Sequence, residues 1–208
     1  LSILDPSRIS SRIANESTDV LQTISKTLIL RRLKKDVLSE LPESIEIKQN
    51  IDLLPKQYKS YQTKLKEFKS ASHEMKLALF GQLRSICDYD PNSDESMKIT
   101  RTLEIIENIV EAGEKAVVFS YTTRPLHVLY QKLLNHTKLA NVSLITGDMP
   151  NQKRDQEINT FKSNENNHVI LCSLKVAGEG LTLTEANNVI FINEWWNPSS
   201  NNQARDRI

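Results

Sequence analysis

Residues 168–192 read HVILCSLKVAGEGLTLTEANNVIFI, and this stretch decides the fold class. It contains two short apolar runs, 169–172 and 189–192, separated by a segment with two glycines. Runs of four residues that are apolar throughout are typical of strands buried on both faces, as in parallel sheets. We therefore predict two parallel strands here, joined by a crossover segment.

Working outward, the same pattern recurs at 116–119 and 142–145, which predicts two further strands. Helical patterns lie between the strands. One runs from Ile99 to Val110 and is stopped by Gly113, and the others begin near Pro125, Pro150 and Ser199. Short strands that alternate with helices form right-handed βαβ units. Residues 96–208 are therefore predicted to form an α/β domain with an open parallel sheet flanked by helices.

The N-terminal half has a different pattern. Residues 44–53 alternate apolar and polar, which predicts a strand. Two helical patterns follow, the first opening at Pro55 with lysines that we expect to be solvated and the second spanning 75–86, and residues 88–96 have the composition of a loop. We therefore divide the chain into a linker region at 1–54, a helical protrusion at 55–95 and the α/β domain at 96–208.

Composition excludes several classes of protein. The formal net charge is +1, so any contact with nucleic acid must come from local patches. No apolar run approaches the ~18 residues of a membrane span, and the first residues do not resemble a signal peptide. The four histidines show no metal-ligand spacing, so no metal site is predicted. The two cysteines form no disulfide framework, and Cys172 is predicted to be buried.

In an open α/β sheet, ligands bind at the carboxyl ends of the strands. Four polar positions follow the predicted strands: Ser120, Thr146-Gly147, Ser173 and Asn193. The Gly178-Glu179-Gly180 segment has two readings. Glycines allow backbone N–H groups to approach a phosphate closely, but the same pattern is common in a simple tight turn.

Further motifs follow in order along the chain. Residues 173–183 read SLKVAGEGLTL, residues 195–198 read WWNP, and residues 203–207 read QARDR. Together they resemble motifs five and six of the Swi/Snf family of DNA-dependent ATPases, within helicase superfamily two. Shorter resemblances to that family lie upstream, at 30–37, 41–42, 57–61, 83–87, 115–120, 145–148 and 154–161.

The resemblance implies one part of a motor with two RecA-like lobes. This chain would be the second, C-terminal lobe, since it contains no Gly-Lys-Thr or Gly-Lys-Ser phosphate-binding signature. ATP with Mg²⁺ would be bound mainly by the first lobe of the same polypeptide. Arg207 would be a catalytic arginine finger, with ATP contacts from Gly178, Glu179, Gly180 and Gln203. Motif six is incomplete at Ile208, so we expect a longer protein, and we expect the chain alone to hydrolyse no ATP.

The resemblance also implies that the lobe binds double-stranded DNA. Hydroxyl, amide and lysine groups would hold the phosphate backbone without reading sequence, and a tryptophan would approach the minor groove. The residues on the family's DNA-contacting positions are Ser120, Thr146, Gly147, Ser173, Lys175 and Trp196. DNA-bound proteins would be the remodelling targets. The expected compartment is the cytoplasm with its nucleoid in a bacterium, or the nucleus in a eukaryote.

The chain departs from the family pattern at Ala177, Thr182, Met97 and Asn193-Glu194. The substituted motif-five positions keep open a non-catalytic docking scaffold derived from such a lobe. A nucleotide-sugar transferase on a similar α/β sheet is a third alternative, but it gives no reason for the spacing from Gln203 to Arg207. Trp195 and Trp196 are adjacent in an extended segment, which predicts that one is buried and the other presented. Arg205 falls on a variable motif position and is predicted to be structural.

Overall fold

The computed structural model describes residues 45–136, 139, 141–177 and 181–205. The chain divides into two compact units, residues 1–49 and 50–208. The motif resemblances at 30–37 and 41–42 lie outside the described residues. Within the first unit, residues 45–49 are irregular and exposed.

The predicted strand at 44–53 is wrong. Residues 45–54 have no regular secondary structure, and Ile45 and Ile47 are 86% and 75% exposed. An alternating pattern becomes a strand only when one face is buried and a neighbouring strand completes the hydrogen bonds. Neither condition is met here within the described part of the chain, so the alternation alone does not produce a strand.

The second unit contains a parallel sheet of four strands with the order β2-β3-β1-β4. All four predicted strands are confirmed. Their bounds are β1 Ala116–Ser120, β2 Val142–Ile145, β3 Val169–Ser173 and β4 Asn188–Phe191. Every residue of the two central strands is buried, which explains why their sequences are apolar without alternation.

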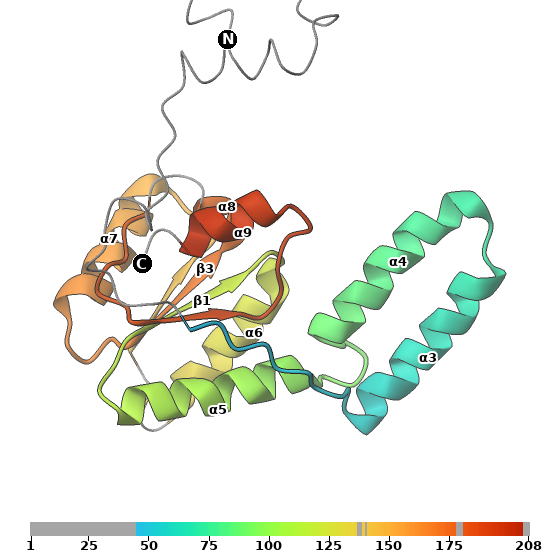
Figure 1. Ribbon diagram of the computed structural model, residues 1–208, viewed down its shortest axis with the longest axis horizontal. Helices are drawn as coiled ribbons and strands as arrows, with labels where there is room; N and C mark the ends of the chain where they lie inside the picture. The colour runs from blue at the N-terminus through green and yellow to red at the C-terminus, as the bar shows by residue number, and fades with distance from the viewer. Residues whose placement is uncertain (1–44, 137–138, 140, 178–180, 206–208) are drawn as a thin grey trace, which may run out of the picture. The chain divides into compact units, whose positions relative to one another are not determined.

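Helices cover both faces of this sheet (Figure 1). One face packs on α5 (Met97–Glu111) and α6 (Thr123–Leu134), and the core there includes Val118 and Leu171. The other face packs on α7 (Asn151–Ser163), α8 (Leu174–Ala177) and α9 (Pro198–Arg205), with a core that includes Val117, Phe119 and Cys172. Successive strand residues therefore serve opposite cores. This doubly covered sheet confirms the predicted α/β class.

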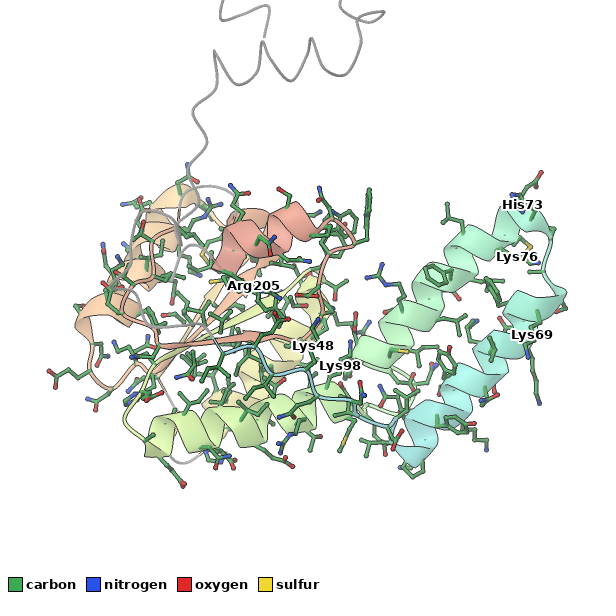
Figure 2. The ribbon with its side chains drawn as sticks, viewed as in Figure 1. Lys48, Lys69, His73, Lys76, Lys98 and Arg205 are labelled. Atoms are coloured by element: carbon green, nitrogen blue, oxygen red, sulfur yellow. The ribbon has the colours of Figure 1, made fainter. Side chains whose placement is uncertain are left out.

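Two helices precede the sheet and lie side by side as an antiparallel hairpin (Figure 1). They are α3 (Pro55–Ser70) and α4 (His73–Asp88). Leu79, Leu83 and Ile86 are the buried apolar residues of α4, at the spacing of a single helix face. In α3 the one residue classed as buried is polar, Gln57. Lys69, His73 and Lys76 lie at the end of the hairpin where the two helices join (Figure 2).

The segment between α4 and α5 is a loop, as predicted, but it is not solvated throughout. Tyr89 and Asp90 are buried, as is Asp88, the last residue of α4, and Asp90 pairs with Glu95 across a tight turn. Ser96 then caps α5, because its hydroxyl accepts a hydrogen bond from the Ile99 amide at 3.1 Å. The loop therefore joins the base of the hairpin firmly to the first helix of the sheet domain.

Candidate nucleic-acid interface at the carboxyl edge of the sheet

The predicted site residues come together because the strands are parallel and in register. Ser120 at the end of β1 is directly opposite Ser173 at the end of β3. On the other side of β3, Ile145 is opposite Cys172, so Thr146 follows at the same edge. Residues separated by more than fifty positions in sequence thus share one edge.

Ser120 is buried and its hydroxyl is already engaged. Its single hydroxyl hydrogen has two acceptors within reach, the Thr122 carbonyl at 2.7 Å and Asn193 Oδ1 at 3.1 Å. A contact between this hydroxyl and a DNA phosphate would require it to exchange those partners. The DNA contact of Ser120 therefore stays a prediction.

Ser173 differs from Ser120 in its hydrogen bonding. It is 1% exposed, and its hydroxyl has no partner among the described residues. A buried hydroxyl without a partner is uncommon, and it retains the capacity to bond a ligand oxygen. Two residues later, Lys175 is exposed on α8. The adjacent Gly178, Glu179 and Gly180 lie outside the described residues.

Thr146 and Gly147 form the turn after β2. Thr146 is buried, and a hydrogen bond from its side chain is the main cause that holds the pKa of the Asp148 carboxyl below its usual value. Gly147 is exposed, and a Cβ placed on it would meet no atom within 4 Å. No described protein atom therefore requires glycine at this position.

The two tryptophans have different surroundings: Trp196 is presented, as predicted for one of the pair, whereas Trp195 is half-buried and not fully buried. Trp195 is half-buried and stacks on the Tyr121 ring, with centroids 3.7 Å apart and planes at 17°. Trp196 is 73% exposed. Asn201 fixes the segment, because it accepts a hydrogen bond from the Trp195 amide at 3.0 Å and donates to the Trp195 carbonyl at 2.8 Å.

The last described helix, α9, carries one predicted ATP contact. Gln203 is exposed, whereas the neighbouring Ala204 is buried in the core. Arg205 forms an ion pair with Glu194 at 2.7 Å and lies 5.2 Å from the centroid of the Phe191 ring (Figure 2). These contacts fit the structural role predicted for Arg205. Arg207 lies outside the described residues, so its role stays a prediction.

The sequence interpretation missed one important group. Asp88, assigned only to a loop, bonds Asn193 at the exit of β4 with 2.6 Å between Oδ2 and Nδ2, and Lys98 with 2.6 Å between Oδ1 and Nζ. The only signal in the sequence was that Asn193 follows a predicted strand. Its partner was not apparent, because 105 positions separate the two residues.

Among the described residues, no three histidine, cysteine, aspartate or glutamate side chains come together as a metal site would need. No helix in the described part of the chain is both long enough and apolar enough to cross a membrane.

Comparison with known families gives two matches, which together span almost the whole chain. Residues 6–112 match the SNF2-related domain, and residues 97–208 match the helicase conserved C-terminal domain.

Curated relatives agree with these matches. A putative ATP-dependent helicase/translocase, YwqA, of Bacillus subtilis is 31% identical over 207 residues, covering 90% of this chain and 22% of the relative. An uncharacterized ATP-dependent helicase of Mycoplasma pneumoniae is 30% identical over 210 residues, covering 93% of this chain and 20% of the relative. The chain thus spans about a fifth of the length of these relatives.

Solved structures agree as well. The Sulfolobus solfataricus SWI2/SNF2 ATPase core domain superposes with a TM-score of 0.69 at 26% identity, covering 98% of this chain and 48% of that one. The same core in complex with double-stranded DNA gives a TM-score of 0.67 at 28% identity, covering 97% and 46%. The α/β domain is thus a RecA-like lobe, and the chain belongs to the SNF2 family, whose helicase conserved C-terminal domain it carries.

Proposed function

We propose that this chain supplies the second motor lobe of an ATP-dependent translocase that moves on double-stranded DNA. One observation carries the proposal: a buried hydroxyl without a partner, an exposed lysine and an exposed tryptophan belong to segments that leave the same edge of the sheet. These are Ser173, Lys175 and Trp196. The similarity to an ATPase core described in complex with double-stranded DNA supports the choice of ligand.

On the DNA side, Lys175 offers a charge and Ser173 a hydroxyl to backbone phosphates, while Thr146 and Gly147 border the same edge. Such contacts position a protein on DNA without reading its sequence, as a motor that steps along any sequence requires. Trp196 would contact the minor groove. Ser120 would contribute only if its hydroxyl released Thr122 and Asn193.

On the ATP side, Arg207 is the proposed arginine finger, and Gln203 with the Gly178–Gly180 segment would line the cleft between lobes. ATP with Mg²⁺ would be bound mainly by the first lobe. The ATP would supply the phosphoryl group whose transfer drives the motor. Charge develops on the phosphoryl oxygens in the transition state, where a planar guanidinium stabilises it. In this assignment residues 1–54 are the linker between lobes and residues 55–95 a helical protrusion.

The catalytic assignment is tested in the full-length protein by replacing Arg207 with Ala. We expect DNA-stimulated ATP hydrolysis to fall by about 10³-fold or more, the size of arginine-finger effects, with duplex binding unchanged. Arg205→Ala is the matched control, since that side chain pairs with Glu194. Turnover at the wild-type rate in the Arg207→Ala protein would remove the finger assignment.

The DNA assignment is tested with the 208-residue chain and a fluorescent duplex of arbitrary sequence. Lys175→Ala should weaken binding and lower the slope of log K against log salt by about 0.9, the value for one phosphate contact. Lys132→Ala, at an exposed position near the end of α6, is the control. If both variants bind like the wild type, the predicted phosphate contact is absent.

The docking scaffold is the rival function. It predicts a full-length protein that binds DNA or protein but hydrolyses no ATP, whereas the motor predicts DNA-stimulated hydrolysis. The 208-residue chain alone should hydrolyse no ATP in either case. The proposed targets are DNA-bound proteins, in the nucleoid of a bacterium or the nucleus of a eukaryote.

A further inference from the structure

We propose that Asp88 and Asn193 form a positioning pair, through which the base of the α3–α4 hairpin holds the Tyr121–Trp195 stack and so sets the orientation of Trp196. The inference rests on the proposed function only in its consequence for DNA. The coupling between the hairpin and the tryptophans is a property of the protein alone.

Asn193 is the centre of the arrangement. Its Nδ2 donates to Asp88 Oδ2 at 2.6 Å and to Thr122 Oγ1 at 3.0 Å. Its Oδ1 accepts from the Tyr121 amide at 2.6 Å and from the Ser120 hydroxyl at 3.1 Å. A primary amide has two donor hydrogens and two acceptor lone pairs. Both hydrogens are used here, and the oxygen accepts from the Tyr121 amide and shares the single Ser120 hydroxyl hydrogen with the Thr122 carbonyl. Asn193 therefore joins the exits of β1 and β4 to the end of α4.

Asp88 connects the pair to the hairpin and to α5. It is the last residue of α4, and its side chain is 10% exposed. Its second carboxylate oxygen accepts from Lys98 Nζ at 2.6 Å, and its backbone carbonyl accepts from the Ser96 hydroxyl at 2.6 Å. Lys98 lies close to the end of α4 in Figure 2. The carboxylate thus bonds a cation on one side and an amide donor on the other.

The path from Asn193 to Trp196 is short and continuous. Asn193 holds the Tyr121 backbone, and the Tyr121 ring stacks on Trp195 at 3.7 Å. Trp195 is the direct neighbour of Trp196, and their ring centroids are 5.4 Å apart. A change at Asp88, which contacts neither tryptophan in any described hydrogen bond or ring contact, should therefore be detectable at Trp196.

The chemistry of the pair allows a reciprocal test. In Asn193→Asp the amide donor is lost and two carboxylates face each other, which like-charge repulsion opposes. In Asp88→Asn an amide replaces the carboxylate that bonds both an amide donor and the Lys98 ammonium. In the double variant Asp88→Asn/Asn193→Asp, the new Asn donates to the new Asp and accepts from Lys98. The new Asp accepts from Tyr121 and Ser120, and the Thr122 hydroxyl, which accepts from Asn193 in the wild type, donates to it instead. The double variant should restore what each single change disturbs.

The readout is tryptophan fluorescence, since the 208-residue chain contains only these two tryptophans. Trp195→Phe serves as the background, so that Trp196 alone is observed. Acrylamide quenching of Trp196 is measured at a temperature where circular dichroism shows each variant to be folded. Relative to the Trp195→Phe background, we expect altered Trp196 quenching when either single change is added and unchanged quenching when both are added. Asp90→Asn is the control. It removes a buried carboxylate two residues after Asp88 that accepts from the Asn92 amide and the Ser93 hydroxyl, and it should leave quenching unchanged.

A purely stabilising role predicts a different result. Both single variants would then have lower melting temperatures but wild-type quenching while folded, and the positioning role would be overturned. Failure of the double variant to restore quenching would also overturn it. If Asn193→Asp does not fold, Thr122→Ala is used in its place, because it removes just one partner of the Asn193 amide. Unchanged Trp196 quenching in both Thr122→Ala and Asp88→Asn would then reject the proposal.

Duplex binding separates this inference from the proposed function. We expect each single variant to raise the duplex Kd by about fivefold, which corresponds to about 1 kcal/mol, and the double variant to recover the original Kd. If the wild-type chain binds no duplex while quenching follows the predicted pattern, the DNA role fails and the positioning pair stands. If binding is normal and quenching never changes, the pair fails and the DNA role stands.

Discussion

Replacing Gln57 with Leu should destabilise the protein, although Gln57 is far from the candidate DNA-binding edge in sequence. Its side chain is fully buried, and Nε2 donates to the Ile86 carbonyl at 2.7 Å. That carbonyl lies in the last turn of α4, where backbone oxygens have no partner within the helix. Gln57 therefore supplies a hydrogen-bond donor to the Ile86 carbonyl, which would otherwise be buried at the end of α4 without a partner.

The magnitude follows from the geometry of these contacts. Loss of one buried partner costs about 1–3 kcal/mol. The other contacts, to the Leu54 and Met97 amides and to the Cys87 carbonyl, are each 3.4 Å long, beyond the range of strong hydrogen bonds, and add little. For a chain of about this size, each kcal/mol shifts Tm by roughly 2–4 °C, so we expect a decrease of about 2–12 °C.

Circular dichroism at 222 nm follows both measurements: urea unfolding gives the loss in free energy of unfolding, and thermal unfolding gives the fall in Tm. Gln82→Leu is the matched control: it makes the same substitution at an exposed position of α4, where effects usually stay within about 0.5 kcal/mol. If Gln57→Leu is as stable as the Gln82→Leu protein, the Gln57–Ile86 bond contributes nothing and the reasoning fails.

Three further predictions concern other parts of the fold. Lys115→Met should lower the free energy of unfolding measured in urea by about 1–2 kcal/mol. The Lys115 ammonium donates to the Phe161 carbonyl near the end of α7 and lies 5.0 Å from the centroid of the Phe161 ring. Equal stability of the two proteins would contradict this. In a thiol assay with Ellman's reagent, Cys87 should react slowly in the folded protein, since burial raises its pKa. Cys172, fully buried with its pKa also raised by burial, should react only after denaturation, and two rapidly reacting thiols in the native state would refute this. Burial acts to raise the pKa of Asp90, but hydrogen bonds from neighbouring hydroxyl and amide groups outweigh it and leave the pKa below its usual value. The stability that Asp90 contributes should therefore be present above its unfolded-state pKa and be lost as pH falls through the lower folded-state pKa; Tm measured from pH 6 to pH 2 should fall less steeply in Asp90→Asn, and parallel curves would contradict it.

The sequence by itself predicted the sheet domain well. The strands are short, buried on both faces and therefore apolar throughout, so each is visible in a window of four or five residues, as at 116–120 and 169–173. The family resemblance was also readable, because it depends on the order and spacing of motifs along the chain. The predicted strand at 44–53 failed for the opposite reason: whether an alternating segment forms a strand depends on a partner that its own residues do not specify.

Tertiary structure alone decided which polar groups are available at the candidate site. Ser120 and Ser173 both end a buried strand and look equivalent in sequence, yet one hydroxyl is engaged by Thr122 and Asn193 while the other has no partner among the described residues. The Asp88–Asn193 bond joins positions 105 residues apart. Local patterns report burial and backbone period, whereas the pairing of polar groups is a property of segments brought together by folding, and for that reason it appears only in three dimensions.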